Sequence, residues 1–281
     1  MPRPARTSFP RALSLTRRAP WTSISAWSWL EVALDLEVVR AALPGRRIVW
    51  FDCVGSTMTE AARLAAQGAA DIVGAEEQTA GRGRYGRHWY SQREAGLYVT
   101  LILSWRLRPE QATLLTLALG LATAEAIARA ADLACDLRWP NDVLIQDKKC
   151  AGILVELAGD RFLAGVGINV NHTSLPAELA GQATSLYLAS GRFHSRERLL
   201  IELVRAADGF TRMLVEGGPE PVLRLFARAS SYARGRRVRV EQNGLILEGV
   251  TEGLAPSGFL WLRQNDGARR LLRAGGLRAV E

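Results

Sequence analysis

The chain has 281 residues, 48% of them hydrophobic, so it is long enough to bury one large core and a second, smaller one. Its net charge of +8 at pH 7 favours an anionic ligand, either a nucleic acid or one small nucleotide. No apolar run approaches the roughly 20 residues that span a bilayer, and the three cysteines match neither a disulfide framework nor a metal pattern. We therefore expect a cytoplasmic protein that does not associate with membranes.

Residues 1–30 contain no acidic residue and are rich in Arg, Ser, Thr and Pro, which is typical of a disordered extension or a transit peptide. A start codon assigned too early would leave the same pattern. The segment is too short and irregular for a winged-helix DNA-binding domain, and it has no continuous apolar region of a secretory signal. We expect a large domain over 31–230 and a small one over 231–281.

The large domain mixes helical and strand patterns in an order typical of an α+β fold. In the second helix Ser56 or Thr57 can cap the N-terminus, Thr57 and Glu60 have capping-box spacing, and Gly68 can end the helix. Two strands are expected within 136–159, around a turn over 146–149. The other predicted elements are helices over 31–43, 109–131 and 196–218, a buried strand over 46–54, and strands over 71–78, 96–105 and 161–172.

The pattern changes at about Tyr232 to short alternating strands separated by glycine turns. Such spacing predicts a small β-barrel of about 50 residues.

The segment GRGRYGRHWYS, Gly81 to Ser91, combines glycines with three arginines. Glycines let backbone N–H groups approach oxygen atoms closely, and the forked guanidinium groups of Arg82, Arg84 and Arg87 suit phosphate and carboxylate alike. We expect this loop to be mobile when empty and to close over its ligand. Taken alone, it is equally consistent with a solvated arginine loop or an RNA-binding tract.

Lys148 and Lys149 are the only lysines of the chain, whereas arginine supplies the rest of the positive charge. This contrast suggests that one of them must be a compact ammonium rather than a planar guanidinium. Alternate side chains of a strand face opposite ways, so we expect Lys148 to point to solvent if Lys149 lies in a site. The other interpretation is a surface hairpin with two charges.

Four segments occur in the order GSTMTEA (55–61), EEQTAGRGRYGRHW (76–89), RWPNDVLIQDKKCAGILVE (138–156) and GVGINVN (165–171). Together they closely resemble the biotin protein ligase family, from about residue 46 to the C-terminus. The resemblance implies a mixed β-sheet flanked by helices, of the biotin/lipoate ligase and class II synthetase-like type, followed by an SH3-like barrel. It also implies that ATP and biotin react to give biotinyl-5′-AMP. The biotin then passes to one lysine of a carrier, such as the biotin carboxyl carrier protein of acetyl-CoA carboxylase.

The chemistry explains why such a site needs cations. The biotin carboxylate must attack the α-phosphate of ATP, and both are anions that repel each other unless positive charge lies between them. The product is a mixed anhydride, which hydrolyses unless a closed loop excludes water.

The resemblance assigns residues to these tasks. Lys149, Arg84 and Asp142 are the expected catalytic residues, and Arg138 stands where the family commonly has lysine. Met58 replaces the usual asparagine, so only a backbone contact is expected there. Ser56, Thr57 and Gln78 are expected to bind the ureido ring and Asn169 the adenine edge, while Gly165 and Gly167 should allow close approach of the nucleotide. The residues expected at the ligands are Ser56, Thr57, Met58, Gln78, Gly81, Arg82, Gly83, Arg84, Arg87, Trp89, Asn141, Lys149, Gly152, Gly167 and Asn169.

Several alternatives stay open at this stage. A lipoate or octanoate ligase shares the fold class, and a basic nucleic-acid-binding protein would use the net charge instead. We expect no sequence-specific DNA binding, and a homodimer is an option. Mg²⁺ is expected with ATP, held partly by phosphates and waters, while His88, His172 and His194 show no metal-ligand spacing.

Overall fold

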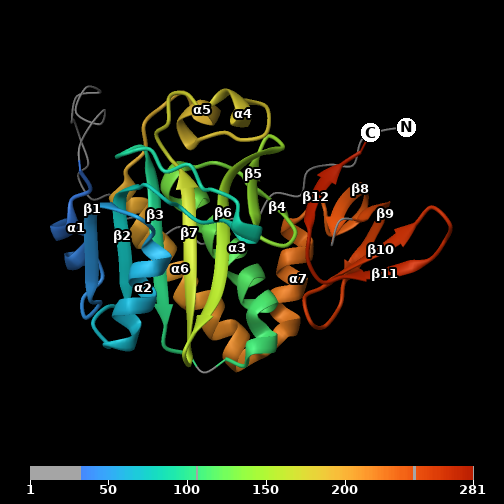
Figure 1. The fold of residues 1–281 in the computed structure, drawn as a ribbon, viewed down its shortest axis with the longest axis horizontal. Coiled ribbons are helices and arrows are strands. Elements are labelled where there is room, and N and C mark those ends of the chain that lie inside the picture. Colours follow the sequence, from blue (N-terminus) through green and yellow to red (C-terminus); the bar gives the residue numbers. More distant parts are fainter. Residues whose placement is uncertain (1–32, 106, 243–244, 281) are drawn as a thin grey trace, which may run out of the picture.

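The computed structural model describes residues 33–105, 107–242 and 245–280. The predictions for residues 1–30 and for the first two residues of the helix over 31–43 lie outside this part of the chain. Figure 1 shows a large sheet flanked by helices and, beside it, a small C-terminal β-domain. Fold class and domain order thus follow the prediction.

The large sheet has seven strands in the order β1-β2-β3-β7-β6-β5-β4. Only β1 and β2 pair in parallel, and the other neighbours are antiparallel, which makes the sheet mixed as predicted. Its strands are β1 (Ile48–Val54), β2 (Ile72–Gln78), β3 (Gly96–Leu103), β4 (Asp136–Arg138), β5 (Asp142–Ile145), β6 (Lys148–Ala158) and β7 (Arg161–Asn169).

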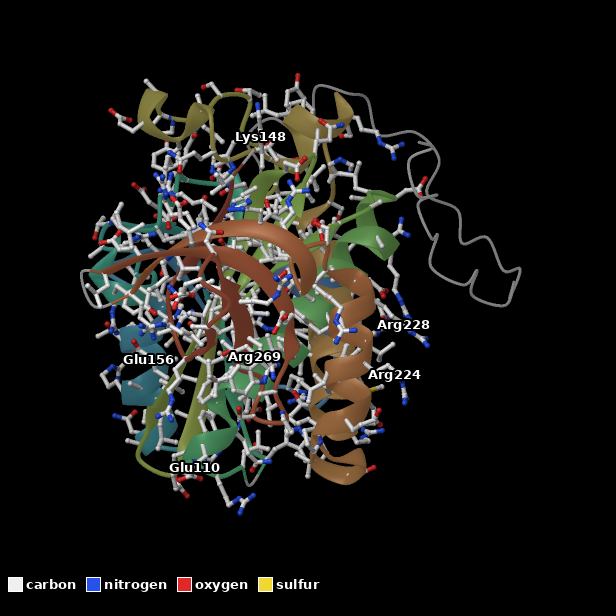
Figure 2. All side chains as sticks on the ribbon, turned by 90° about the vertical axis from the view of Figure 1, so that its right-hand side faces the viewer. Glu110, Lys148, Glu156, Arg224, Arg228 and Arg269 are labelled. Carbon is white, nitrogen blue, oxygen red and sulfur yellow. The ribbon has the colours of Figure 1, made fainter. Side chains whose placement is uncertain are left out.

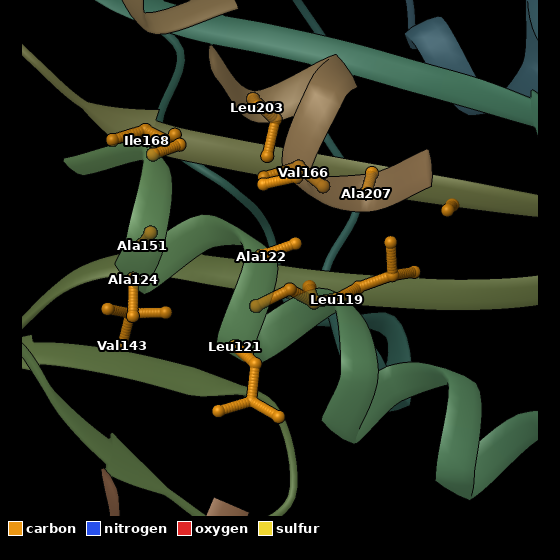
Figure 3. Packing of buried hydrophobic residues seen from close by; sticks show 14 of the residues in the cluster. Leu119, Leu121, Ala122, Ala124, Val143, Ala151, Val166, Ile168, Leu203 and Ala207 are labelled. Carbon is orange, nitrogen blue, oxygen red and sulfur yellow. The ribbon is translucent and has the colours of Figure 1, made fainter. Parts of the chain in front are cut away.

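Helices cover both faces of this sheet (Figure 1). Those on the face opposite α2 build the larger core, shown in Figure 3, where Leu119 and Ala122 of α3 and Leu203 of α6 pack near Val166 of β7. A second, smaller core lies under α2. The main helices are α1 (Leu36–Ala42), α2 (Thr57–Ala66), α3 (Ala112–Ala131), α6 (Arg196–Gly217) and α7 (Pro219–Ala229).

Strand β7 shows how the sequence assigns side chains to the two faces. Phe162, Ala164, Val166 and Ile168 belong to the larger core, whereas Leu163 belongs to the core under α2. Since side chains alternate along a strand, the glycines at 165 and 167 fall on the α2 face. That face therefore has two positions without side chains, where another group can approach the backbone.

The structure corrects several predicted elements. The strand over 46–54 was expected to be buried, but β1 lies at the sheet edge and only Ile48 is buried. The region 136–159 holds three strands instead of two, and the turn before β6 is only Gln146 and Asp147, both with positive φ. Two-residue turns of this type match the twist of the strands they join. The short helices α4 (Ala177–Ala180) and α5 (Leu186–Ser190) were not predicted, and neither was α7.

The terminal domain is a five-stranded antiparallel sheet in the order β11-β10-β9-β8-β12. It is joined firmly to the large domain, because Trp139 donates from Nε1 to the Gly258 carbonyl at 2.9 Å and Ser231 donates from its backbone N–H to Asp136 at 2.8 Å. Its strands are β8 (Arg234–Gln242), β9 (Leu245–Leu254), β10 (Leu260–Gln264), β11 (Arg269–Leu272) and β12 (Gly276–Ala279).

One described segment, Pro109–Ala131, is long and apolar enough to cross a bilayer by length and composition alone. Yet 72% of its most apolar stretch is buried inside the protein. Leu115, Leu117 and Leu119 on this helix belong to the larger core. The segment therefore has the packing of a core helix.

A buried ion pair joins the sheet to α6. Arg196 donates from Nη1 to Oε2 of Glu76 at 2.6 Å, and both side chains are no more than 4% exposed. Glu76 also accepts hydrogen bonds at Oε1 from the backbone of Leu34 and from the Trp50 indole. Such a pair is costly to break, because Arg196 would lose the buried carboxylate to which it donates.

Candidate functional site

A cavity lies on the α2 face of the large sheet, between the start of α2 and the segment Gly81–Trp89. It is partly open to solvent: about 50 Å³ can hold a water-sized group, and the empty space including the open mouth is about 470 Å³. It is lined by Ser56, Thr57, Met58, Gln78, Arg82, Gly83, Arg84, Trp89, Tyr98, Val99, Asn141, Lys149, Gly152, Ile153, Leu154, Gly165, Val166 and Gly167.

A buried polar network forms one wall. The Gln78 side-chain carbonyl accepts hydrogen bonds from the N–H and the hydroxyl of Thr57, at 2.9 and 3.1 Å. Gln78 donates in turn to Ser91, and Thr100 donates to the Thr57 hydroxyl at 3.0 Å. The polar groups of Thr57 therefore bond to residues of the sheet beneath α2. Thr57 does not form the predicted capping box with Glu60.

Ser56 occupies the N-cap position of α2, but its side chain makes no capping hydrogen bond. The residue is 4% exposed, and its hydroxyl has no hydrogen-bond partner among the described residues. A buried hydroxyl without a partner is unfavourable in the folded protein unless a ligand or a water binds it. In this cavity the Ser56 hydroxyl is free to bind a polar group.

The indole of Trp89 lies against the floor of the cavity. A methyl group added at Gly167 would lie 2.5 Å from Nε1 of Trp89, and one added at Gly152 would lie 3.0 Å from its ring. Both glycines thus make room for this one side chain. Nε1 of Trp89 is buried and has no partner within the described chain, so a second unpaired polar atom lies beside the cavity. Met58 packs in the same way over Gly165, where an added methyl group would meet its sulfur at 2.8 Å.

The glycine-rich segment folds back on itself as a small hairpin. Trp89 donates to the Gly81 carbonyl at 2.9 Å and Gly83 to the Arg87 carbonyl at 2.7 Å. A side chain at position 81 would collide with the Trp89 carbonyl at 2.5 Å, so this close approach requires glycine. The tip, Tyr85, has the left-handed conformation φ 59°, ψ 34°.

Two cationic side chains, Arg138 and Lys149, share the carboxylate of Asp142. Lys149 contacts Oδ1 of Asp142 at 2.5 Å, and Arg138 contacts Oδ2 at 2.8 Å. Burial raises the pKa of Asp142, but the two cations outweigh burial and hold that pKa below its ordinary value. Asp142 is therefore ionised at neutral pH and fixes the position of the Lys149 ammonium, which lies 5.2 Å from the ring centroid of Trp89.

The backbone of Lys149 is held just as firmly. Its N–H donates to the Gln182 carbonyl, and its own carbonyl accepts from the Thr184 N–H, both at 2.9 Å. Lys148 is exposed and extends from the surface, as the sequence predicted (Figure 2). Only the second lysine of the pair faces the cavity.

The arginines of the loop differ in their surroundings. Arg84 faces the cavity and donates to Oδ1 of Asn141 at 3.4 Å. Arg82 forms an ion pair with Glu156 of β6 at 2.8 Å. Arg87 is exposed and does not line the cavity.

Four of the residues predicted at the site lie outside the cavity lining. These are Gly81, Arg87, Asp142 and Asn169, and Asn169 donates its side-chain amide to the Thr184 carbonyl at 3.0 Å. Gly165 lines the cavity beside Gly167, and the structure adds Tyr98, Val99, Ile153, Leu154 and Val166 to the predicted residues. The added residues belong to strands and carry no motif in the sequence that would have marked them as part of a site. The described residues hold no group of three or more His, Cys, Asp or Glu side chains that could bind a metal ion.

Comparison with known proteins identifies the family. Residues 50–172 match the biotin/lipoate A/B protein ligase family, and residues 234–275 match the biotin protein ligase C-terminal domain. The biotin–[acetyl-CoA-carboxylase] ligase of Mycobacterium tuberculosis is 35% identical over 88% of this chain and 96% of its own length. The chain belongs to the biotin protein ligase family.

Other members of the biotin protein ligase family resemble the chain to a similar degree. The bifunctional ligase/repressor BirA of Bacillus subtilis is 32% identical over 84% of this chain and 75% of its own length. Among solved structures, the biotin protein ligase from Aquifex aeolicus in complex with biotin and ATP has a TM-score of 0.73 and 30% identity. It covers 83% of this chain and 99% of its own.

Proposed function

We propose that this protein activates biotin with ATP as biotinyl-5′-AMP and transfers the biotin to a lysine of a biotin carboxyl carrier protein domain. One observation carries the proposal. The cavity has two buried polar atoms, on Ser56 and Trp89, that find no partner among the described residues, and they lie beside the cations of Lys149 and Arg84. A ligand with a polar ring at one end and a carboxylate at the other fits this combination.

The chain's own residues supply the charge that the first step requires. The Lys149 ammonium is compact enough to lie between the attacking carboxylate oxygen and an α-phosphate oxygen, and Asp142 holds it in position until those anions arrive. Arg84, which lines the same cavity, adds a forked donor. Both groups stabilise negative charge that develops as the carboxylate oxygen bonds to phosphorus and pyrophosphate leaves.

Ligand entry requires the loop to move. Only about 50 Å³ of the cavity is wide enough for a water-sized group, and the Trp89 indole packs against the glycines of its floor. Opening of the Gly81–Trp89 hairpin would admit biotin and ATP. Its closure would exclude water from the mixed anhydride.

We propose that Mg²⁺ accompanies ATP. Within the described residues no three-carboxylate cage exists, and both oxygens of Asp142 already bind cations. Phosphate oxygens and waters would therefore provide most of its ligands, and the ion would neutralise phosphate charge.

The partners of the protein are part of the same proposal. A biotin-dependent carboxylase subunit, such as that of acetyl-CoA carboxylase, is the acceptor of biotin. β1 and β4 end the large sheet, and an edge strand can pair with the carrier or with a second copy. Cys53, Cys135 and Cys150 are free thiols, which suits a reducing cytoplasm.

We also propose that the protein reads no DNA sequence. Binding to promoter DNA should be weak, independent of sequence and lost as salt rises, because only counterion release would drive it. A tight complex with one sequence at physiological salt would refute this.

Biotin-dependent exchange of labelled pyrophosphate into ATP tests the proposed activity without knowledge of the carrier. We expect exchange with biotin and none with lipoate or octanoate. Exchange with lipoate alone would assign the chain to the lipoate branch. Absence of exchange with every acid, in folded protein with Mg²⁺, would overturn the ligase proposal.

A further inference from the structure

The tip of the glycine-rich hairpin is bound to the terminal domain. Tyr85 is 61% exposed, but its hydroxyl accepts a hydrogen bond from the backbone N–H of Gly275 at 2.8 Å. These residues are 190 positions apart. The contact thus joins the loop that covers the cavity to a domain that does not line it.

Gly275 presents this N–H from a fixed position. It is buried in the turn between β11 and β12, with φ of 117°, a conformation that side chains rarely adopt. A methyl group there would lie 2.6 Å from Cγ1 of Val240 and 3.0 Å from the carbonyl oxygen of Glu241. Only glycine fits, so the turn packs tightly against β8 and the direction of the N–H is set by the domain.

The terminal domain is in turn a fixed support. Trp139 is 1% exposed and donates to Gly258 from the RWPND segment itself, and Ser231 binds Asp136 just before that segment. The hairpin, by contrast, must move for a ligand to enter. The hydrogen bond from Gly275 to Tyr85 therefore links a moving part to a stationary one.

Tyr85 also acts on the arginine beside it. Arg84 donates from Nη2 to the Tyr85 hydroxyl at 3.2 Å, and its guanidinium lies 5.1 Å from the Tyr85 ring centroid. Through Nη1 the same guanidinium reaches Asn141. A continuous chain of contacts thus runs from the terminal domain through Tyr85 to a cation of the cavity.

From these contacts we propose that Tyr85 is a positioning residue through which the terminal domain holds the Gly81–Trp89 hairpin closed. This inference rests on the proposed function, because it assigns the terminal domain a role in biotin entry and in retention of biotinyl-5′-AMP. This tether, the hydrogen bond from Gly275 to Tyr85, includes no ligand atom, so it stabilises the closed hairpin whether the cavity is empty or loaded. Its loss accelerates opening in both states.

Tyr85→Phe tests this with a minimal change, since it removes only the hydroxyl. Tyr90→Phe is the matched control, because its hydroxyl bonds to Gln92 at 3.2 Å within the same segment and not to the terminal domain. Hydrogen exchange of the unliganded protein is the first measurement. The Gly275 amide and the amides of residues 82–88 should exchange about 2- to 10-fold faster in Tyr85→Phe than in the parent protein, because one hydrogen bond is lost. The same amides should be unchanged in Tyr90→Phe.

Binding kinetics supply the second measurement. Biotin association and dissociation rates should both rise about 2- to 10-fold in Tyr85→Phe, with the Kd nearly unchanged, and release of biotinyl-5′-AMP into solution should rise similarly. If Tyr85 instead contacted biotin directly, the variant would raise only the biotin dissociation rate. That result would overturn the tether proposal. If Tyr85 only aligned Arg84, the variant would slow pyrophosphate exchange without changing amide exchange. That result would also overturn the tether proposal.

The two proposals fail separately. Unchanged exchange at Gly275 in Tyr85→Phe would overturn the tether whatever the activity. Faster exchange at Gly275 in a protein that binds no biotin would support the tether and overturn the ligase function. A melting temperature equal to that of the parent protein would show that the variant is folded.

Discussion

Ser56→Ala separates a structural role from a ligand-binding role at one side chain. Serine at a helix N-cap usually contributes about 1 kcal/mol, because its hydroxyl accepts a hydrogen bond from the first turn. At α2 that hydrogen bond is absent, and the buried hydroxyl has no partner among the described residues. We therefore expect Ser56→Ala to change the free energy of unfolding by no more than about 0.5 kcal/mol.

Biotin affinity should respond strongly. A ligand polar group that loses its only buried partner costs about 1–3 kcal/mol, which corresponds to roughly a 5- to 150-fold rise in Kd. Isothermal titration calorimetry would measure the affinity, and thermal denaturation the stability. If the affinity is unchanged while the protein loses stability, Ser56 is a cap and its assignment to the ureido ring is wrong.

Ser195→Ala is the matched control at another N-cap. Its hydroxyl accepts a hydrogen bond from the N–H of Arg198 at 3.0 Å, at the start of α6. This variant should lose about 1 kcal/mol and so melt roughly 2–4 °C lower, with unaltered biotin binding. The two serines should thus give opposite results in the two assays.

Further predictions follow from the charged groups. Lys149→Arg keeps the charge but replaces a compact ammonium by a planar fork, so pyrophosphate exchange should fall at least about 100-fold, while the exposed Lys148→Arg should be neutral; near-normal turnover of Lys149→Arg would refute the geometric argument. Glu76→Gln removes the carboxylate that balances the buried charge of Arg196, and urea denaturation should show a loss of about 3–5 kcal/mol. Burial lowers the pKa of His172 from 6.5 to about 4, so below pH 6.5 the unfolded chain takes up a proton that the folded protein does not. Stability should therefore fall by roughly 3 kcal/mol between pH 6.5 and 4, and the same slope in His172→Gln would show that another group is responsible.

Much of the site could be predicted from the sequence because its signals are local. The glycines of the Gly81–Trp89 segment, the lysine pair and the alternation along β7 each lie within a few residues. Gly167 was expected to permit close approach of a ligand, and the structure shows that Trp89 makes the close approach instead. The glycine at position 167 correctly indicated a close approach to the backbone. Which group makes that approach depends on Trp89, which is distant in the sequence.

Tertiary contacts decided the rest. Ser56 has the residue type of an N-cap, yet its buried hydroxyl makes no capping bond and the residue lines the cavity. No pattern in the sequence connects Tyr85 with Gly275, because a hydrogen bond between residues 190 positions apart depends on how the terminal domain docks on Trp139. Periodicity and turn residues determine helices, strands and the faces they present, since these depend on neighbouring backbone and side chains. Which faces and tips meet is set by the packing of the whole chain, and that packing brings the loop, the lysine and the terminal domain together.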